Sequence, residues 1–267
     1  MNVELTGEQR EQLSRDGYLL VHAVLDSATV ATLHSVVVEL ADAHEHNGRA
    51  YAARNLLRAA PIAELARSEA VAGLVVQALR QADRYAPMDS EAKPLSSTRP
   101  DRISVPPARL TVRAVRGLLF NKVAQANWAV PWHQDLTIAV RERRESPGFG
   151  PWSVKDGAVH VQPPDEVIAR MLAVRIHLDD TAAENGALRV IPGSHREGRL
   201  SPEAIGSWTT SRKAVTIEAP AGSALLMRPH LLHASSTAER PAQRRVIHLE
   251  FAADALPFGL EWNEAVA

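Results

Sequence analysis

The order of two sequence patterns constrains the fold of this chain more than any other feature. Up to about residue 81 the apolar residues recur at helical spacing, as Val71, Leu74 and Val75 do on one face. From Leu110 onward short β-rich runs take over, each bounded by turn residues. Helices followed by strands predict an α+β fold, and so many short strands favour a double-sheet jelly roll as its β part.

Short local signals place the individual elements. Thr6 and Gln9 have the spacing of a capping box, so we expect a helix to begin there. A short strand over Tyr18 to Val24 should follow, then a helix capped at Asp26-Ser27, and a further helical region from about Pro61. The later strands are expected at Val112 to Val123, Trp132 to Val140, Met171 to Leu178, Ala187 to Ile191, Ala214 to Ile217, Ser223 to Met227 and Arg244 to Phe251.

We expect a single domain over residues 1–267, because a chain of this length can bury a substantial core. The part over 1–81 is mainly helical, with its helices packed on a jelly-roll core over 110–255. Between them, the stretch over 82–107 is rich in proline and serine and poor in apolar residues. Such a segment predicts a surface excursion or a mobile flap.

Composition excludes several classes of partner and site. A formal net charge of -1 offers no basic surface to nucleic acid, so we expect a small-molecule partner. No apolar run approaches the roughly 20 residues that cross a bilayer, and the first residues lack a secretion signal, so no membrane association and a cytoplasmic location are expected. The chain has no cysteine, so a metal site would need histidine and carboxylate ligands. The oligomeric state is left open.

One short motif offers such ligands. His133 and Asp135 lie two residues apart in a segment of strand-like composition, and alternate residues of a strand project from the same face. They would supply two ligands of a 2-His-1-carboxylate facial triad, which leaves positions on iron(II) open. The third ligand would be His233, or His230 if the register differs.

A candidate anion anchor lies further along the chain. Arg244 follows His233 by eleven residues, and its planar guanidinium could hold a carboxylate in a bidentate grip. Arg245, on the opposite face of the same expected strand, is the alternative. Lys122 and Asn127 precede the first motif, and because both are polar we expect them to face the same pocket.

Together these motifs resemble the phytanoyl-CoA dioxygenase family. The resemblance rests on His133-x-Asp135, on the Asn-Gly-Ala-Leu-Arg-Val-Ile-Pro-Gly-Ser-His segment from Asn185 to His195, on His233-x-Ser235 and on Arg244, in the family's order. It implies a double-stranded β-helix (cupin-like) core with iron(II) on the two histidines and the carboxylate. It also implies 2-oxoglutarate and O2 as co-substrates.

The same resemblance implies roles around 2-oxoglutarate. Arg244 would bind its distal carboxylate, and Ser235 matches a position that touches the same group. Arg175 occupies a position where relatives often carry an aromatic residue that lines this pocket, so it is a departure from the family and a candidate contact. We place Lys122 with these co-substrate contacts.

The segment between the first ligand pair and Met171 predicts a long loop, and long loops inside compact domains are often lids. We expect it to lie over the iron and help select the substrate, with a plain surface loop as the alternative. The remaining histidines, among them His177, His195 and His248, are expected to have structural roles. The substrate candidates are Trp152, Lys155, His160 and Gln162 from this loop, and Asn127.

The function that the resemblance implies is an iron(II)- and 2-oxoglutarate-dependent dioxygenase. We expect a hydroxylase that acts on an unactivated carbon of a small organic molecule and releases succinate and CO2. The carboxylate of Asp135 argues against halogenation, since related halogenases carry a small residue there. Alternatives are desaturation, epimerisation or cyclisation on the same scaffold, or a catalytically inactive jelly-roll binding protein. The sequence does not name the substrate.

Overall fold

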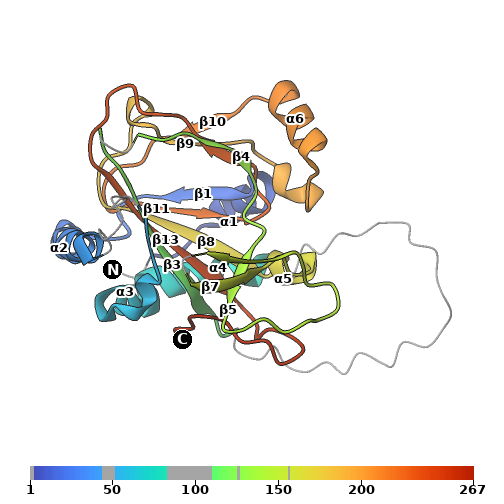
Figure 1. The fold of residues 1–267 in the computed structure, drawn as a ribbon. Helices are drawn as coiled ribbons and strands as arrows, with labels where there is room; N and C mark the ends of the chain where they lie inside the picture. Colours follow the sequence, from blue (N-terminus) through green and yellow to red (C-terminus); the bar gives the residue numbers. More distant parts are fainter. Residues whose placement is uncertain (1–2, 44–51, 83–109, 125–126, 156) are drawn as a thin grey trace.

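A computed structural model describes residues 3–43, 52–82, 110–124, 127–155 and 157–267 (Figure 1). Beyond residue 82, the excursion expected over 82–107 lies outside these residues. The helices are α1 (Gly7–Asp16), α2 (Ser27–Ala43), α3 (Ala60–Arg67), α4 (Glu69–Ala82), α5 (Asp165–Ala169) and α6 (Pro202–Ser211). The strands are β1 (Tyr18–Val21), β2 (Ala52–Arg54), β3 (Arg113–Lys122), β4 (Val130–His133), β5 (Ile138–Val140), β6 (Trp152–Lys155), β7 (Ala158–Val161), β8 (Met171–His177), β9 (Leu188–Val190), β10 (Val215–Ile217), β11 (Ala224–Met227), β12 (His233–Ser235) and β13 (Arg244–Ala252).

Two facing antiparallel sheets form the core. The larger sheet has the strand order β1-β11-β8-β13-β3-β2, and the smaller has the order β10-β9-β12-β4. Figure 1 shows them as two layers, with α2, α3 and α4 against the larger sheet on the side away from the smaller one. A third, small sheet of order β5-β7-β6 extends from one end. The expected α+β jelly roll with N-terminal helices packed on it is confirmed.

The helices begin and end where local chemistry requires. The Thr6 hydroxyl accepts a hydrogen bond from the Gln9 backbone N–H (3.2 Å), and the Gln9 side chain accepts one from the Thr6 N–H (2.9 Å), which completes the expected capping box. Helix α1 ends at Asp16 and is capped by Gly17, whose φ of 82° suits glycine. The Asp26 carboxylate accepts from the Thr29 N–H (2.8 Å) and caps α2. Among the described residues, no helix is both long and apolar enough to cross a bilayer.

Strand alternation divides the larger sheet into two chemically different faces. Leu119, Val174 and Ile247 face the helices and belong to the main hydrophobic core. The residues at alternate positions of the same sheet face the smaller sheet. Among them, Ala173 and Leu225 belong to a second apolar cluster. The N-terminal part contributes β1 and β2 to this sheet, so the jelly roll is not confined to the segment after residue 110.

The structure corrects several of the expected elements. The strand expected over Trp132 to Val140 is interrupted, since β4 ends at His133 and β5 begins at Ile138. The long loop expected before Met171 contains an antiparallel hairpin, in which Trp152 pairs with Val161. The patterns did not indicate β2, β12, α5 or α6, all of which are short or lack a clear apolar period.

Candidate metal centre and co-substrate cavity

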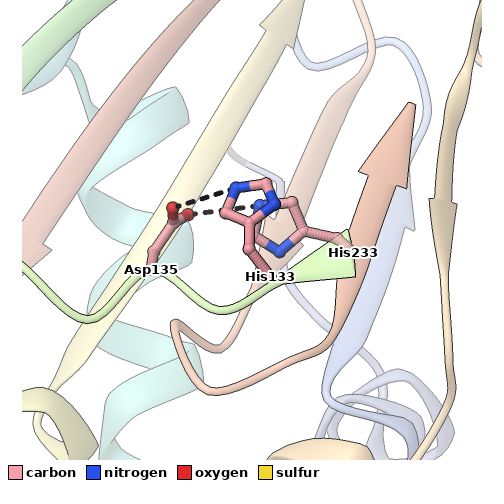
Figure 2. Close-up of side chains that lie close together, drawn as sticks. All are labelled: His133, Asp135 and His233. Carbon is pink, nitrogen blue, oxygen red and sulfur yellow. Dashed lines mark ion pairs between the residues drawn. The ribbon is translucent and has the colours of Figure 1, made fainter. Parts of the chain in front are cut away.

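Two histidines meet across adjacent strands of the smaller sheet. His133 is the last residue of β4, His233 is the first of β12, and the two are direct register partners. Asp135 lies beyond β4 in an irregular segment, so the expectation that one strand aligns His133 and Asp135 was wrong. The three side chains nevertheless converge, with one ligand atom of each within 4.8 Å of the others (Figure 2).

The segment that carries Asp135 is held by its neighbours. The backbone N–H of Asp135 donates to the carbonyl of Pro229 (2.9 Å). The buried Gln134 amide donates to the carbonyls of His230 (2.6 Å) and Gly198 (2.8 Å), and its oxygen accepts from the Leu200 N–H (2.8 Å). These bonds replace the strand ladder and turn the Asp135 carboxylate toward the histidines.

The hydrogen bonds of the two imidazoles suit a metal ion. Nδ1 of His133 lies 2.8 Å from the Pro131 carbonyl, and Nδ1 of His233 lies 2.9 Å from the Leu231 carbonyl. A carbonyl only accepts, so each Nδ1 carries the hydrogen and each Nε2 has a free lone pair. These Nε2 atoms lie 3.8 Å and 3.6 Å from the Asp135 carboxylate oxygens. Three Lewis-basic atoms facing one another fit a bound divalent cation.

The protonation states agree with this donor set. Burial lowers the pKa of His233 to about 4, so its imidazole is neutral at neutral pH. Burial acts to raise the pKa of Asp135, but the neighbouring His233, His248 and His133 outweigh it and bring the pKa to about 2. The site therefore offers a neutral imidazole and an ionised carboxylate, the forms that bind metal. His230 lies outside this cluster, with Nε2 3.6 Å from the Asp165 carboxylate.

The cluster opens into a cavity of about 840 Å³, including its mouth, between the two sheets. Arg244 and Lys122 are register partners on β13 and β3 at one end of it. One guanidinium nitrogen of Arg244 donates to the Gly186 carbonyl, while its buried Nε has no hydrogen-bond partner among the described residues. Arg245 points the other way and pairs with Asp179 (2.6 Å), so Arg244 is the arginine that faces the cavity.

Ser235 and Arg175 line this end of the cavity together with Lys122 and Arg244. The Lys122 ammonium donates to the Ser235 hydroxyl (3.2 Å) and to the Ser236 carbonyl. Arg175 lies over the Phe120 ring at 5.3 Å and hydrogen-bonds Nδ1 of His248 (3.1 Å). Burial, followed by the nearby Arg244, lowers the pKa of Lys122 to about 8, and burial lowers the pKa of Arg175 to about 10. Both shifts reflect buried cations that a dianion would stabilise.

The structure places the other sequence candidates outside the cavity lining. Both amide atoms of Asn127 bind the Ala238 backbone, and Gln162 accepts from Arg199 (3.1 Å). Trp152 lies 5.7 Å from the Arg143 guanidinium. His160 is buried in the hairpin, with Nδ1 3.0 Å from the Ala158 carbonyl. Lys155 is exposed, and desolvation of its ammonium group, followed by the positive charges of Arg116 and Arg54, lowers its pKa.

Sequence reasoning missed four polar residues that line the cavity: Arg54, Arg116, His248 and Glu250. Arg116 and Glu250 are register partners on β3 and β13. An available signal was the alternation of Arg116, Leu118, Phe120 and Lys122, which places two cations on one strand face. Which residues of β13 lie beside these cations depends on the register between β3 and β13, and the sequence does not show that register.

Several known proteins resemble this chain in sequence or in fold. The family model described as phytanoyl-CoA dioxygenase matches residues 13–246. L-proline trans-4-hydroxylase of Streptomyces griseoviridis is 31% identical over 154 residues, and the match spans only 48% of this chain and 49% of that protein. EctD from S. alaskensis, solved with 2-oxoglutarate and 5-hydroxyectoine, superposes with a TM-score of 0.64 at 18% identity over 93% of this chain and 76% of its own.

The carbocyclase SnoK from nogalamycin biosynthesis, described as non-heme and alpha-ketoglutarate-dependent, has the same fold. Its TM-score is 0.63 at 13% identity, with 93% of this chain and 84% of SnoK covered. At these identities the solved structures establish the fold alone, whereas the family model covers most of the chain. The chain therefore belongs to the phytanoyl-CoA dioxygenase family.

Proposed function

We propose that this protein is an iron(II)- and 2-oxoglutarate-dependent oxygenase that hydroxylates an unactivated carbon of a small organic molecule. The observation that carries the proposal is one cavity that joins the His133, Asp135 and His233 cluster to the buried cation of Arg244. A jelly-roll binding protein has no need for both a metal-ligand set and an anion anchor in one cavity.

Each part of the cavity has a role in this reaction. The three clustered side chains would hold iron(II) through two Nε2 atoms and a carboxylate. Arg244, Lys122 and Ser235 hold the distal carboxylate of 2-oxoglutarate, and Arg175 adds positive charge beside it. With O2, the bound iron and 2-oxoglutarate supply the oxidising power that converts a C–H bond to C–OH, with succinate and CO2 released.

The hairpin β6–β7 is proposed to lie beside the bound substrate. Burial lowers the pKa values of both Lys155 and His160, and the positive charges of Arg116 and Arg54, which line the cavity, act in the same direction. Substrate roles for Trp152, Gln162 and Asn127 stay predictions.

Hydroxylation is the favoured outcome because of two relatives. One is named as a proline hydroxylase, and EctD was solved with a hydroxylated compound and 2-oxoglutarate. Cyclisation is the second candidate, since SnoK is described as a carbocyclase. The two outcomes differ in how the substrate is placed rather than in the metal site.

Anaerobic titration with iron(II) and 2-oxoglutarate tests the proposal. We expect a weak metal-to-ligand charge-transfer absorption, followed by succinate release once O2 and candidate substrates are added. The His233→Ala variant should give neither. Absence of both signals from the folded wild-type protein would refute the oxygenase proposal, and a hydroxylated product identified by mass spectrometry would separate hydroxylation from cyclisation.

A further inference from the structure

A metal ligand on irregular backbone needs other groups to fix its position. Asp135 lies on a loop beyond the end of β4, as Figure 2 shows. Gln134, which precedes it, is only 8% exposed, and two of its three side-chain hydrogen bonds go to the backbone of Gly198 and Leu200. Both N–H donors of the amide are paired, so the side chain has one preferred orientation. The segment over 198–200 therefore sets where Gln134 and the residue after it lie.

Arg199 lies between these two backbone contacts and extends to the residues that follow the hairpin β6–β7. Its guanidinium contacts three acceptors there: the Gln162 side chain (3.1 Å), the Pro163 carbonyl (2.8 Å) and the Asp165 carboxylate (3.1 Å). A guanidinium presents its N–H groups in a rigid, planar arrangement, so it can fix two segments relative to each other. Arg199 thus joins this stretch to the segment that holds Gln134.

The stretch that Arg199 contacts is continuous with the hairpin. Gln162 directly follows β7, its carbonyl accepts from the Gly150 N–H (2.8 Å), and its N–H donates to the Pro151 carbonyl (3.3 Å). Backbone bonds therefore tie Gln162 to the chain that enters β6, while its side chain binds Arg199. A continuous series of contacts leads from the hairpin to the metal ligand.

The outer part of this series lies at the surface. The side chains of Arg199 and Asp165 are 33% and 46% exposed, and an exposed ion pair contributes little to stability by itself. Its position beside the two backbone bonds to Gln134 gives it a different consequence. Loss of the Arg199 contacts releases the segment over 198–200 and, with it, the loop that carries Asp135.

We propose that Arg199 is a positioning residue for the metal ligand Asp135 and that it acts through Gln134. This rests on the proposed function, in which Asp135 binds iron(II). Arg199 holds the segment over 198–200 against the residues that follow the hairpin, and that segment holds Gln134. The affinity of the metal site thereby depends on contacts of the hairpin β6–β7, which is itself proposed to lie beside the substrate.

Metal binding without turnover tests this role. Anaerobic equilibrium dialysis measures the iron(II) dissociation constant, and the d–d absorption of bound cobalt(II) reports the ligand geometry. We expect Arg199→Ala to weaken iron(II) binding about 2–30-fold, the range for residues that act through a network, and to change the cobalt(II) spectrum. Gln134→Leu should weaken it about 10–100-fold, as the loss of an outer-shell contact does. Arg199→Lys keeps the charge beside Asp165 and should recover part of the affinity.

Arg196→Ala is the matched control. It removes an exposed arginine from the same segment, and the Arg196 side chain has no hydrogen bond or ion pair with the part of the chain that the structure describes. The iron(II) affinity and cobalt(II) spectrum of this variant should match those of the wild type. If Arg199→Ala also matches the wild type in both measurements, the proposal is overturned.

A double-mutant cycle separates action through Gln134 from a general loss of stability. In the Gln134→Leu background, Arg199→Ala should weaken iron(II) binding by less than about twofold, because the route to Asp135 is already broken. Independent effects that multiply overturn the proposal. If Gln134→Leu does not fold, the comparison of Arg199→Ala with Arg196→Ala still decides.

The wild-type protein distinguishes this failure from failure of the proposed function. If it binds iron(II) and both arginine variants bind equally well, only the positioning role is wrong. If the wild type binds neither iron(II) nor cobalt(II), the metal site fails, and the proposed function fails with it.

Discussion

At the scale of single residues, the placement of hydrogens and charges decides what the cavity can bind. Both metal-facing imidazoles donate through Nδ1 to backbone carbonyls, so Nε2 faces Asp135 as a lone pair. Arg244 and Arg245 are adjacent in the chain but face opposite sides of β13, and only Arg244 lines the cavity. A substitution at one of these positions should therefore change ligand binding more than a substitution at the neighbouring residue does.

We predict that His233→Ala weakens iron(II) binding at least 100-fold. The change removes one of three convergent donors, and losing even an outer-shell partner of a metal ligand costs about 10–100-fold. Anaerobic equilibrium dialysis with iron(II) measures the effect. His230→Ala is the control, because its ring lies beside Asp165 instead. Greater loss from His230→Ala than from His233→Ala would contradict the assignment.

We predict that Arg244→Ala raises the dissociation constant for 2-oxoglutarate by about 10–150-fold, since a hydrogen bond to a charged group contributes about 1.5–3 kcal/mol. Titration of the anaerobic iron(II) protein, followed by absorption, measures it. Arg245→Ala should keep the affinity while losing stability, because it breaks the pair with Asp179. Similar 2-oxoglutarate affinities in both variants would show that Arg244 is not the anchor.

At the scale of elements, one contact joins the turn after α1 to the segment that follows β9. The Gly193 N–H donates to the Asp16 carbonyl (2.9 Å), and Nε2 of His195 lies 3.2 Å from the Ser14 carbonyl. Gly17 lies directly against the His195 ring. Since β9 pairs with β12, this contact supports the strand that carries His233.

We predict that Gly17→Ala destabilises the fold by more than about 1–2 kcal/mol. The left-handed backbone alone costs a non-glycine residue about that much, and an added Cβ would overlap the His195 imidazole. Gly206→Ala in α6 is the matched control, because nothing lies within 4 Å of its added Cβ and alanine favours helix. Urea unfolding followed by circular dichroism compares them, and equal midpoints would refute the predicted contact.

His195 should also make stability depend on pH. Burial, followed by the charge of Arg228, lowers its pKa in the folded protein from 6.5 to about 4, and Arg196 and His230 act in the same direction. Between these values the unfolded chain binds a proton that the folded chain does not, so stability is full above pH 6.5 and falls toward pH 4. The loss is on the order of 2–3 kcal/mol.

Urea unfolding at pH 7.5 and pH 4.5, in wild type and in His195→Asn, isolates this contribution. The wild type should lose more stability on acidification than the variant does. Identical losses would show that His195 does not titrate between the folded and unfolded states as its burial implies.

At the scale of the whole molecule, the cavity lies between two sheets whose strands come from distant parts of the chain. Strands β3, β8 and β13 form one wall, and β4, β9 and β12 form the other. A ligand that binds both walls therefore stabilises the whole fold rather than one element.

We predict that iron(II) and 2-oxoglutarate together raise the melting temperature by about 5–10 °C. Ligand at 100 times its dissociation constant adds about 2.7 kcal/mol, and each kcal/mol shifts a domain of 150–250 residues by about 2–4 °C. Anaerobic scanning fluorimetry measures the shift. His233→Ala should lose most of it, and a full shift in that variant would place the ligands elsewhere.

Much of the site was predictable from residues near one another in the sequence. The capping pair Thr6 and Gln9 and the motif of His133 and Asp135 depend on side-chain chemistry and short spacings, which the sequence displays directly. The strand that the spacing predicts through Asp135 is nevertheless absent, because hydrogen bonds of the Gln134 side chain and of the Pro229 carbonyl hold that segment instead.

The sequence by itself determined which groups were available: histidine and carboxylate ligands without thiols, an arginine eleven residues after the last ligand, and the order of helices before strands. Only the tertiary structure decided which of these groups meet. His133 and His233 pair across two strands, and Arg116 pairs with Glu250, over separations of a hundred residues or more. Such pairs depend on strand register, where a slip of one residue turns every side chain to the other face.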